Sequence, residues 1–249
     1  MKLQREHRVT SSKKILDEVL AQAEAAARVK KKFMVVFDLD STLFCVSPRI
    51  RSILDQLSAD QELLQRFPKS TPTLHGLDVT PTDWGIRTVL IRSQIIGTLD
   101  FFEMVRSKWA ERFFSSEYLK NDLPYPGAVK YVQRLAALGA EIRYLTGRDW
   151  PRMGLGTVAS LDQWQFPLAS QQHLHMKPDS NRHDADFKLD TLRHLQLESP
   201  DIYFFENEPV IINLVHRQLP SLPIIFINSI HSGRESAPDH LPKIDPNFE

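Results

Sequence analysis

Short apolar runs and amphipathic stretches alternate along this chain from residue 33 onward. The runs are four or five residues long, largely apolar, and bounded by polar or turn-forming residues. A run of this length predicts a strand buried on both faces of a sheet, and strands that alternate with helices predict parallel pairing. We therefore expect strands over 33–37, 141–145, 173–176, 201–205 and 223–227.

The amphipathic stretches carry apolar residues at helical spacing, with capping or turn-forming residues at their ends. The first is expected to begin at a cap formed by Ser11 or Ser12 and to end near Val29. After residue 227 the prolines predict an irregular tail. Further helices are expected over 128–138 and 152–164, from about 186, and from 209.

Residues 45–120 interrupt this alternation. They show helical periodicity, several prolines in the middle, and little that resembles a buried strand. We interpret them as a helical cap inserted into a core made of residues 1–44 and 121–249. The predicted fold class is α/β, a three-layer Rossmann-like parallel sheet core with an inserted helical cap.

Composition narrows the class of protein without choosing a function. The chain has 249 residues, of which 42% are hydrophobic, and its 31 Lys+Arg balance its 31 Asp+Glu. No overall field favours nucleic acid or an anionic membrane, although nucleic acid is not excluded. A single cysteine excludes an internal disulfide, and the absence of a long apolar run or signal-peptide pattern leads us to expect a cytoplasmic protein without a membrane partner. The oligomeric state stays open.

Two carboxylates follow the first expected strand. Asp38 and Asp40 stand where ligands bind in open α/β sheets, at the carboxyl end of the strand, and their spacing directs them to the same side. Two like charges at this separation suggest a metal site with a nucleophile and an acid/base. The alternative is an Asp-Ser-Thr turn that caps a helix.

Other strand ends carry polar groups as well. Thr146 and Gly147 follow 141–145, and the Thr146 hydroxyl can donate to a phosphate oxygen or cap a helix. Lys188 falls in the first turn of the helix expected near 186, where an anionic partner would offset its unfavourable position in the helix dipole. Lys177 is the competing lysine.

The strand over 201–205 ends in acid. Glu206, Asn207 and Glu208 follow it and form an oxygen-rich cluster that suits Mg²⁺. The alternative is that these acidic residues stabilise the start of a helix through its dipole, since Pro209 predicts that a helix begins at this point.

Taken together, these segments resemble the haloacid dehalogenase-like phosphohydrolase superfamily. Its Asp-X-Asp-X-Thr motif matches residues 38–42, its Thr after a strand matches Thr146, and its Lys at a helix start matches Lys188. Its fourth motif, usually an Asp pair, departs here to Glu206, Asn207 and Glu208. The resemblance implies Asp38 as nucleophile, Asp40 as general acid/base, Mg²⁺ held by Asp38, Asp40 and Glu206 with Asn207 and Glu208 as further candidates, and phosphate bound by Thr146, Lys188, Ser41 and Gly147.

The resulting functional hypothesis is a Mg²⁺-dependent phosphomonoester hydrolase that works through an aspartyl-phosphate. A cap that limits access favours a small phosphorylated metabolite as substrate. The alternatives within the superfamily are a phosphotransferase and a nucleic-acid 3′-phosphatase. A non-catalytic module that binds a phospho-ligand or a protein is the alternative from another class.

Overall fold

The computed structural model describes residues 2–249, with side chains from Ser12 onward. Two compact units can be distinguished. One comprises Met1–Phe44, Pro124–Pro151 and Leu161–Glu249, and the other Cys45–Leu123 and Arg152–Ser160. No helix of the described chain is long and apolar enough to cross a membrane.

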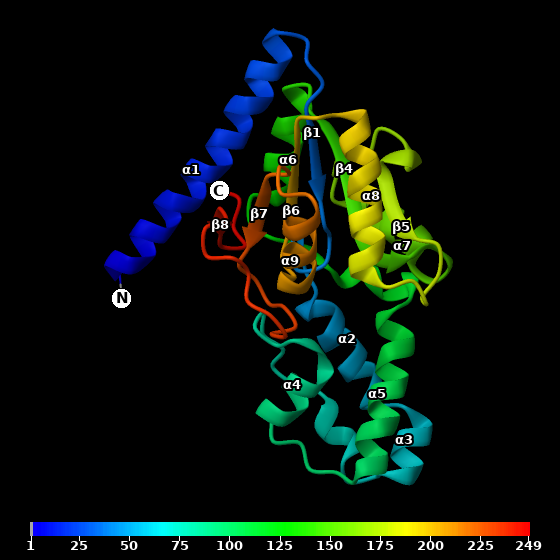
Figure 1. The fold of residues 1–249 in the computed structure, drawn as a ribbon. Coiled ribbons are helices and arrows are strands. Elements are labelled where there is room, and N and C mark those ends of the chain that lie inside the picture. The colour runs from blue at the N-terminus through cyan, green and yellow to red at the C-terminus, as the bar shows by residue number, and fades with distance from the viewer. Residues whose placement is uncertain (1) are drawn as a thin grey trace. The chain divides into compact units, whose positions relative to one another are not determined.

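A six-stranded sheet forms the centre of the first unit (Figure 1). All of its strand pairs are parallel, which confirms the predicted α/β class. The sixth strand was not expected, because residues after 227 were predicted to be irregular throughout. The strands in spatial order are β5 (Leu174–Lys177), β4 (Glu141–Asp149), β1 (Met34–Phe37), β6 (Ile202–Glu206), β7 (Ile224–Ile227) and β8 (Lys243–Ile244).

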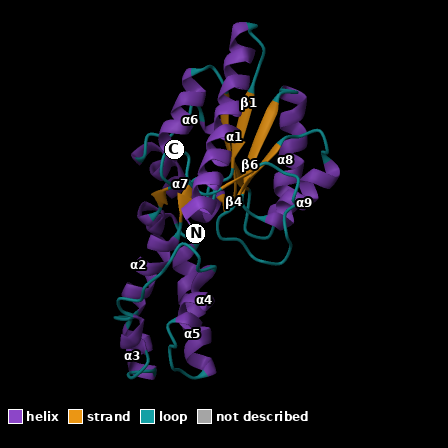
Figure 2. Ribbon diagram, turned by 90° about the vertical axis from the view of Figure 1, so that its left-hand side faces the viewer, coloured by secondary structure: helices purple, strands orange, loops and turns teal. Residues whose placement is uncertain are grey.

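Helices cover both faces of this sheet (Figure 2). On one face, α1 (Lys2–Arg28) packs against α6 (Ala128–Ala137), where the Tyr131 hydroxyl donates to the Leu16 carbonyl at 3.2 Å. On the other face, α8 (Asp184–Glu198) packs against α9 (Pro209–Gln218). The helix α7 (Trp150–Gln163) follows β4. The cap predicted at Ser11 or Ser12 is wrong, since α1 begins at Lys2 and runs through both residues.

The central strands are apolar on both faces because each face is covered. Met34 and Val36 of β1 are fully buried in a cluster with residues of α8 and α9, such as Leu192. On β6 the ring of Phe205 lies toward α6, with its centroid 6.2 Å from that of Tyr131. Burial on two sides explains why these segments appear in the sequence as unbroken apolar runs.

The second unit is helical and has its own apolar core. Its fully buried Arg49 pairs with the equally buried Asp122, with Arg49 Nε 2.7 Å from Asp122 Oδ1. That residues 45–120 act as a cap over a site stays a prediction. The helices of this unit are α2 (Ser47–Leu57), α3 (Gln61–Arg66), α4 (Gly85–Arg92) and α5 (Leu99–Phe113), with 3₁₀ turns at Thr71–Leu74 and Ser116–Asn121; the short strands β2 (Phe44–Cys45) and β3 (Leu123–Pro124) pair with each other.

Candidate active site

Strand register brings three of the predicted site segments to one edge of the sheet. Phe37 lies opposite Tyr144 of β4 on one side and Phe205 of β6 on the other. The residues that follow these positions, Asp38 and Glu206 among them, therefore emerge side by side at the carboxyl ends of adjacent strands. The Asp38 amide continues the ladder by donating to the Phe205 carbonyl at 3.0 Å.

Lys188 connects two of these carboxylates. Its Nζ lies 2.6 Å from Asp38 Oδ1 and 2.7 Å from Glu206 Oε2. All three side chains are buried, with exposures of 3%, 5% and 1% for Lys188, Asp38 and Glu206. Lys188 was expected in the first turn of its helix, but α8 begins at Asp184, so Lys188 is one turn further in. The earlier start still directs its side chain to the edge of the sheet.

Burial and the opposing charges set the ionisation of this cluster. Burial raises the pKa of the Asp38 carboxyl above its usual value, against the attraction of Lys188. Burial likewise raises the pKa of Glu206 to about 7, with Lys188 opposing the rise and the charge of Asp38 adding to it. Burial lowers the pKa of Lys188, but the two carboxylates outweigh it and the net pKa is raised. Two acids thus share one firmly protonated ammonium.

Asp40 has a different partner. Arg148 Nε lies 3.0 Å from Asp40 Oδ2 and Arg148 Nη2 lies 2.7 Å from Asp40 Oδ1. The Arg148 side chain is 1% exposed, whereas that of Asp40 is 32% exposed. Arg148 was not among the predicted site residues, although it lies in the same Thr-Gly-Arg-Asp segment as Thr146.

The turn after β1 is held by backbone bonds. Ser41 adopts a left-handed conformation, with φ of 61°, and its amide donates to the Phe44 carbonyl at 2.7 Å. The Thr42 hydroxyl donates to Asn207 Oδ1 at 3.2 Å. Asn207 Nδ2 in turn donates to the Ile230 carbonyl at 2.7 Å. This second bond fixes the amide so that its oxygen faces the turn after β1.

Thr146 and Gly147 lie inside the long strand β4, which runs on through Asp149. Thr146 is 1% exposed, and its Oγ1 accepts from the Arg148 amide at 3.3 Å. Gly147 faces Asp184 closely, because a Cβ built on this glycine would lie 2.4 Å from Asp184 Oδ2. Asp184 Oδ1 accepts from Lys177 Nζ at 2.6 Å. Lys177, the competing lysine, is therefore bound to Asp184 and not to Asp38.

Glu208 is engaged elsewhere. Its Oε1 accepts from the Val210 amide at 3.4 Å and caps α9. The Ser232 amide donates to its Oε2 at 2.9 Å, and the Ser232 hydroxyl to its Oε1 at 2.6 Å. Both oxygens thus hold the start of α9 and the segment 229–232, and a metal-binding role for Glu208 stays a prediction.

The segment 229–232 is the second feature that the sequence interpretation missed. Its Ser229 hydroxyl donates to the Ser41 carbonyl, and Ile230 and Ser232 hold Asn207 and Glu208 as described above. Residues predicted to be an irregular tail therefore brace the predicted site. No local pattern in the sequence signals these long-range contacts.

The oxygen donors at this edge suit a divalent cation. Among the described residues, no group of three or more His, Cys, Asp or Glu side chains is gathered to hold a metal ion. Asp38 and Glu206, however, place two buried carboxyl groups on one ammonium, so the cluster carries an excess of negative charge once both are ionised. Mg²⁺ is commonly held by one or two carboxylates with further oxygens to complete its shell. Asp38, Glu206 and the Asn207 amide oxygen, with the Asp40 carbonyl, fit that description.

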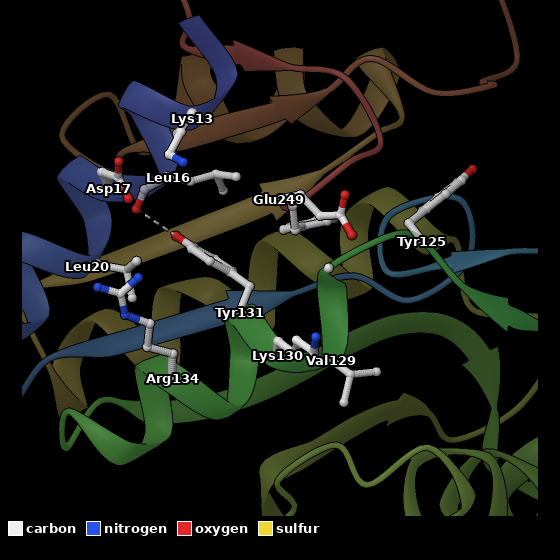
Figure 3. A pocket seen from close by; sticks show the side chains of 12 residues that line it. Lys13, Leu16, Asp17, Leu20, Tyr125, Val129, Lys130, Tyr131, Arg134 and Glu249 are labelled. Atoms are coloured by element: carbon white, nitrogen blue, oxygen red, sulfur yellow. Dashed lines mark hydrogen bonds between the residues drawn. The ribbon is translucent and has the colours of Figure 1, made fainter. Parts of the chain in front are cut away.

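A separate cavity of about 400 Å³ lies between α1, α6 and the residues at the C-terminal end (Figure 3). Its lining includes Leu16, Tyr131, Arg134 and Phe248, and none of the predicted site residues. In Figure 3, Tyr131 points from α6 toward α1. The cavity therefore lies apart from the carboxylate cluster.

In comparisons with known proteins, matches come from solved structures and bear on the fold alone. No family model matches the chain, and neither does any curated protein. Among solved structures, the "Putative Phosphatase" of Clostridium difficile is 12% identical, covers 82% of this chain and 89% of its own, and has a TM-score of 0.52. Protein Tyrosine Kinase A of Mycobacterium tuberculosis is 14% identical, with 86% and 94% covered and a TM-score of 0.50. A haloacid dehalogenase-like family hydrolase of Streptococcus pneumoniae is 12% identical, with 79% and 85% covered and a TM-score of 0.48.

Proposed function

We propose that the chain is a haloacid dehalogenase-like protein that hydrolyses phosphate monoesters at the edge of its sheet. Its fold is similar to that of a phosphatase of Clostridium difficile, with a TM-score of 0.52, and residues 38–42, Thr146 and Lys188 match the motifs of that superfamily. The observation that carries the proposal is the buried Lys188 ammonium held between Asp38 and Glu206. Lys188 is 3% exposed, and its two partners lie at the ends of adjacent strands, Asp38 directly after β1 and Glu206 as the last residue of β6. A buried cation beside a carboxylate nucleophile supplies the charge that an incoming phosphate needs.

Asp38 is the proposed nucleophile. One of its oxygens forms a bond to phosphorus while the bond between phosphorus and the leaving oxygen breaks, and the electron pair of that bond goes to the leaving oxygen. Asp40 gives a proton to this oxygen, which departs as an alcohol. The product on the protein is an aspartyl-phosphate at Asp38.

Asp40 then acts in the opposite direction. Its carboxylate takes a proton from a water molecule as the water oxygen bonds to phosphorus. The bond between phosphorus and the Asp38 oxygen breaks, its electron pair returns to Asp38, and inorganic phosphate leaves. Asp40 has regained its proton and Asp38 its charge, so the cycle needs only substrate and water.

Phosphate binding is assigned to residues around the nucleophile. Lys188 neutralises charge on the phosphate oxygens, and Thr146, Ser41 and Gly147 contribute a hydroxyl or a backbone amide. When bound, Mg²⁺ held by Asp38, Glu206, Asn207 and the Asp40 carbonyl offsets the repulsion between the carboxylate and the phosphate. These four proposed ligands are the oxygen donors that were described for the cation in the active-site subsection.

The substrate is proposed to be a small phosphorylated metabolite. Support comes from the helical unit, which folds around an apolar core of its own, as a cap that limits the size of the substrate requires. A panel of phosphorylated metabolites, with a 3′-phosphorylated oligonucleotide in the same assay, tests this assignment. Selective turnover of the oligonucleotide would overturn it in favour of a nucleic-acid 3′-phosphatase.

The activity itself is tested with p-nitrophenyl phosphate and Mg²⁺. We expect the wild-type protein to release p-nitrophenol, Asp38→Asn to release none above background, and a chelator to abolish wild-type turnover. Equal release by the wild type and Asp38→Asn would exclude Asp38 as nucleophile. Analysis of the products in the presence of an added alcohol separates hydrolysis from phosphoryl transfer.

A further inference from the structure

Arg148 binds the carboxylate of Asp40 through a bidentate contact. Two different nitrogens of the guanidinium, Nε and Nη2, reach the two oxygens of one carboxylate at 3.0 and 2.7 Å. Such a fork fixes the plane of the carboxylate as well as its position, which a single hydrogen bond does not. The orientation of Asp40 is therefore set by Arg148 rather than by the free rotation of its own side chain.

The two partners differ in their access to solvent. The side chain of Asp40 is 32% exposed, while that of Arg148 is 1% exposed. A substrate that reaches the edge of the sheet can contact Asp40 but not the guanidinium behind it. Arg148 must then act through Asp40, as a positioning residue.

The backbone holds Arg148 rigidly in this place. Its amide donates to Thr146 Oγ1, and the strand β4 continues past it to Asp149. The fork also connects two strands, since Asp40 follows β1 and Arg148 lies on β4, 108 positions further along the chain. Any displacement of the guanidinium would therefore turn the Asp40 carboxylate relative to Asp38.

We propose that Arg148 aims the Asp40 carboxyl at the leaving oxygen of the substrate, and this inference rests on the phosphomonoesterase activity proposed above. While one Asp40 oxygen carries the proton, the other keeps its hydrogen bond to the guanidinium. The carboxyl group of Asp40 therefore stays oriented toward the leaving oxygen. The proton then passes to the leaving oxygen as its bond to phosphorus breaks. Asp40 is left as a carboxylate, on which the full fork closes again.

Loss of the two-point contact between Arg148 and Asp40 should slow hydrolysis most for substrates whose leaving group needs a proton in order to depart. A leaving group that is stable as an anion departs without a proton, so a misaimed Asp40 costs little. Phenol, chemically the side chain of tyrosine with a pKa of about 10, needs that proton far more than p-nitrophenol does. Phenyl phosphate and p-nitrophenyl phosphate have nearly the same shape and differ mainly in this property.

The test compares kcat/KM of both substrates for the wild type and Arg148→Lys. Lysine keeps the positive charge and loses the fork. Since general acid catalysis contributes ~10²–10⁴-fold, we expect kcat/KM of Arg148→Lys to fall at least about tenfold more for phenyl phosphate than for p-nitrophenyl phosphate. Because kcat/KM ends at the first irreversible step, the later attack of water does not blur the comparison.

Arg143→Lys is the matched control. Arg143 lies on the same strand, is 10% exposed, and pairs with the carboxylates of Glu141 and Glu198 away from the carboxyl edge. Its variant should change kcat/KM of the two substrates by the same factor. Arg148→Gln serves as a second variant, and thermal unfolding of each variant shows that the compared proteins are folded.

The outcomes separate this inference from the activity on which it rests. An equal loss for both substrates in Arg148→Lys and Arg148→Gln, or no loss, would overturn the positioning role while wild-type turnover still supports the phosphatase. A wild type that hydrolyses neither substrate, or an Asp38→Asn that hydrolyses both, would overturn the phosphatase itself.

Discussion

Replacement of Lys188 by methionine removes the ammonium that binds both Asp38 and Glu206. The substitution keeps most of the side-chain volume, so the main change is electrostatic. Both carboxylates would stay in a site where they are 5% and 1% exposed. Breaking a buried ion pair by removing one partner costs ~3–5 kcal/mol. For a chain of this length that predicts a fall in Tm of roughly 6–20 °C.

Lys177→Met provides the comparison. Lys177 is also buried, with an 8% exposed side chain, and it pairs at 2.6 Å with Asp184. Asp184 is 53% exposed, so water solvates its carboxylate when the lysine is lost. The expected cost is ~0–1 kcal/mol, as for other pairs with an exposed member. Comparison of the two variants therefore separates the cost of leaving buried carboxylates without their lysine from the cost of losing a buried lysine as such.

The pH dependence has a defined sign. Glu206 already has a pKa of about 7, above its ordinary value of 4.5, and loss of Lys188 raises it further. A raised carboxyl pKa means that the folded state holds the proton longer than the unfolded state, so stability falls as pH rises from 4.5 through the folded pKa. The destabilisation of Lys188→Met should therefore be small near pH ~5 and largest above pH ~8.

The assay is urea unfolding of the wild type and both variants across this pH range, with a chelator present so that no divalent cation replaces the lost charge. In the same proteins, we expect Lys188→Met to lower phosphatase activity by ~10²-fold or more and Lys177→Met to be mild. Equal destabilisation by the two substitutions, or a destabilisation by Lys188→Met that shrinks as pH rises, would refute the electrostatic reasoning.

Two further predictions concern stability away from the carboxylate cluster. Arg49→Met should destabilise the helical unit by ~3–5 kcal/mol, because it removes the guanidinium that pairs with the fully buried Asp122, and a loss below ~1 kcal/mol in chemical denaturation would contradict this. His175 is partly buried, and its Nε2 is buried without a hydrogen-bond partner among the described residues, so burial lowers its pKa to about 4 from 6.5. Because the unfolded chain then binds the proton more readily, wild-type stability should fall as pH drops from 6.5 toward 4. Denaturation curves of His175→Leu should show a weaker decline of stability over this range. An unchanged decline would show that other groups cause the loss of stability.

The position of the site could be predicted because it depends on short-range signals. Apolar runs such as 33–37 and 201–205 mark strands buried on both faces, and the ends of parallel strands meet at one edge. Asp38 and Glu206 were placed together by this rule. The lysine that binds them was also predicted, although its helix begins at Asp184 and not near 186. Buried Ala185 packs the extra turn onto the core, a tertiary contact that no capping signal announces.

The parts that were missed depend on contacts between distant segments. Arg148 pairs with Asp40 across 108 residues, and nothing next to either residue in the sequence indicates the other. The strand β8 is only two residues long. It is held against β7 by hydrogen bonds such as that from the Phe226 amide to the carbonyl of Pro242, which precedes β8, at 2.8 Å. A pattern of two residues carries no periodicity, so such a strand emerges only when its partner is in place.

The most direct test of the central claim is the detection of the phosphoryl group on Asp38. Asp40→Asn should slow the attack of water on the intermediate, so this variant is mixed with p-nitrophenyl phosphate and Mg²⁺, quenched in acid, and digested for mass spectrometry. We predict one phosphoryl group on the peptide that contains Asp38, labile to base, and none in the double variant with Asp38→Asn. A phosphoryl group on any other residue, or unmodified Asp38 in a variant that still releases p-nitrophenol in a burst, would contradict the account.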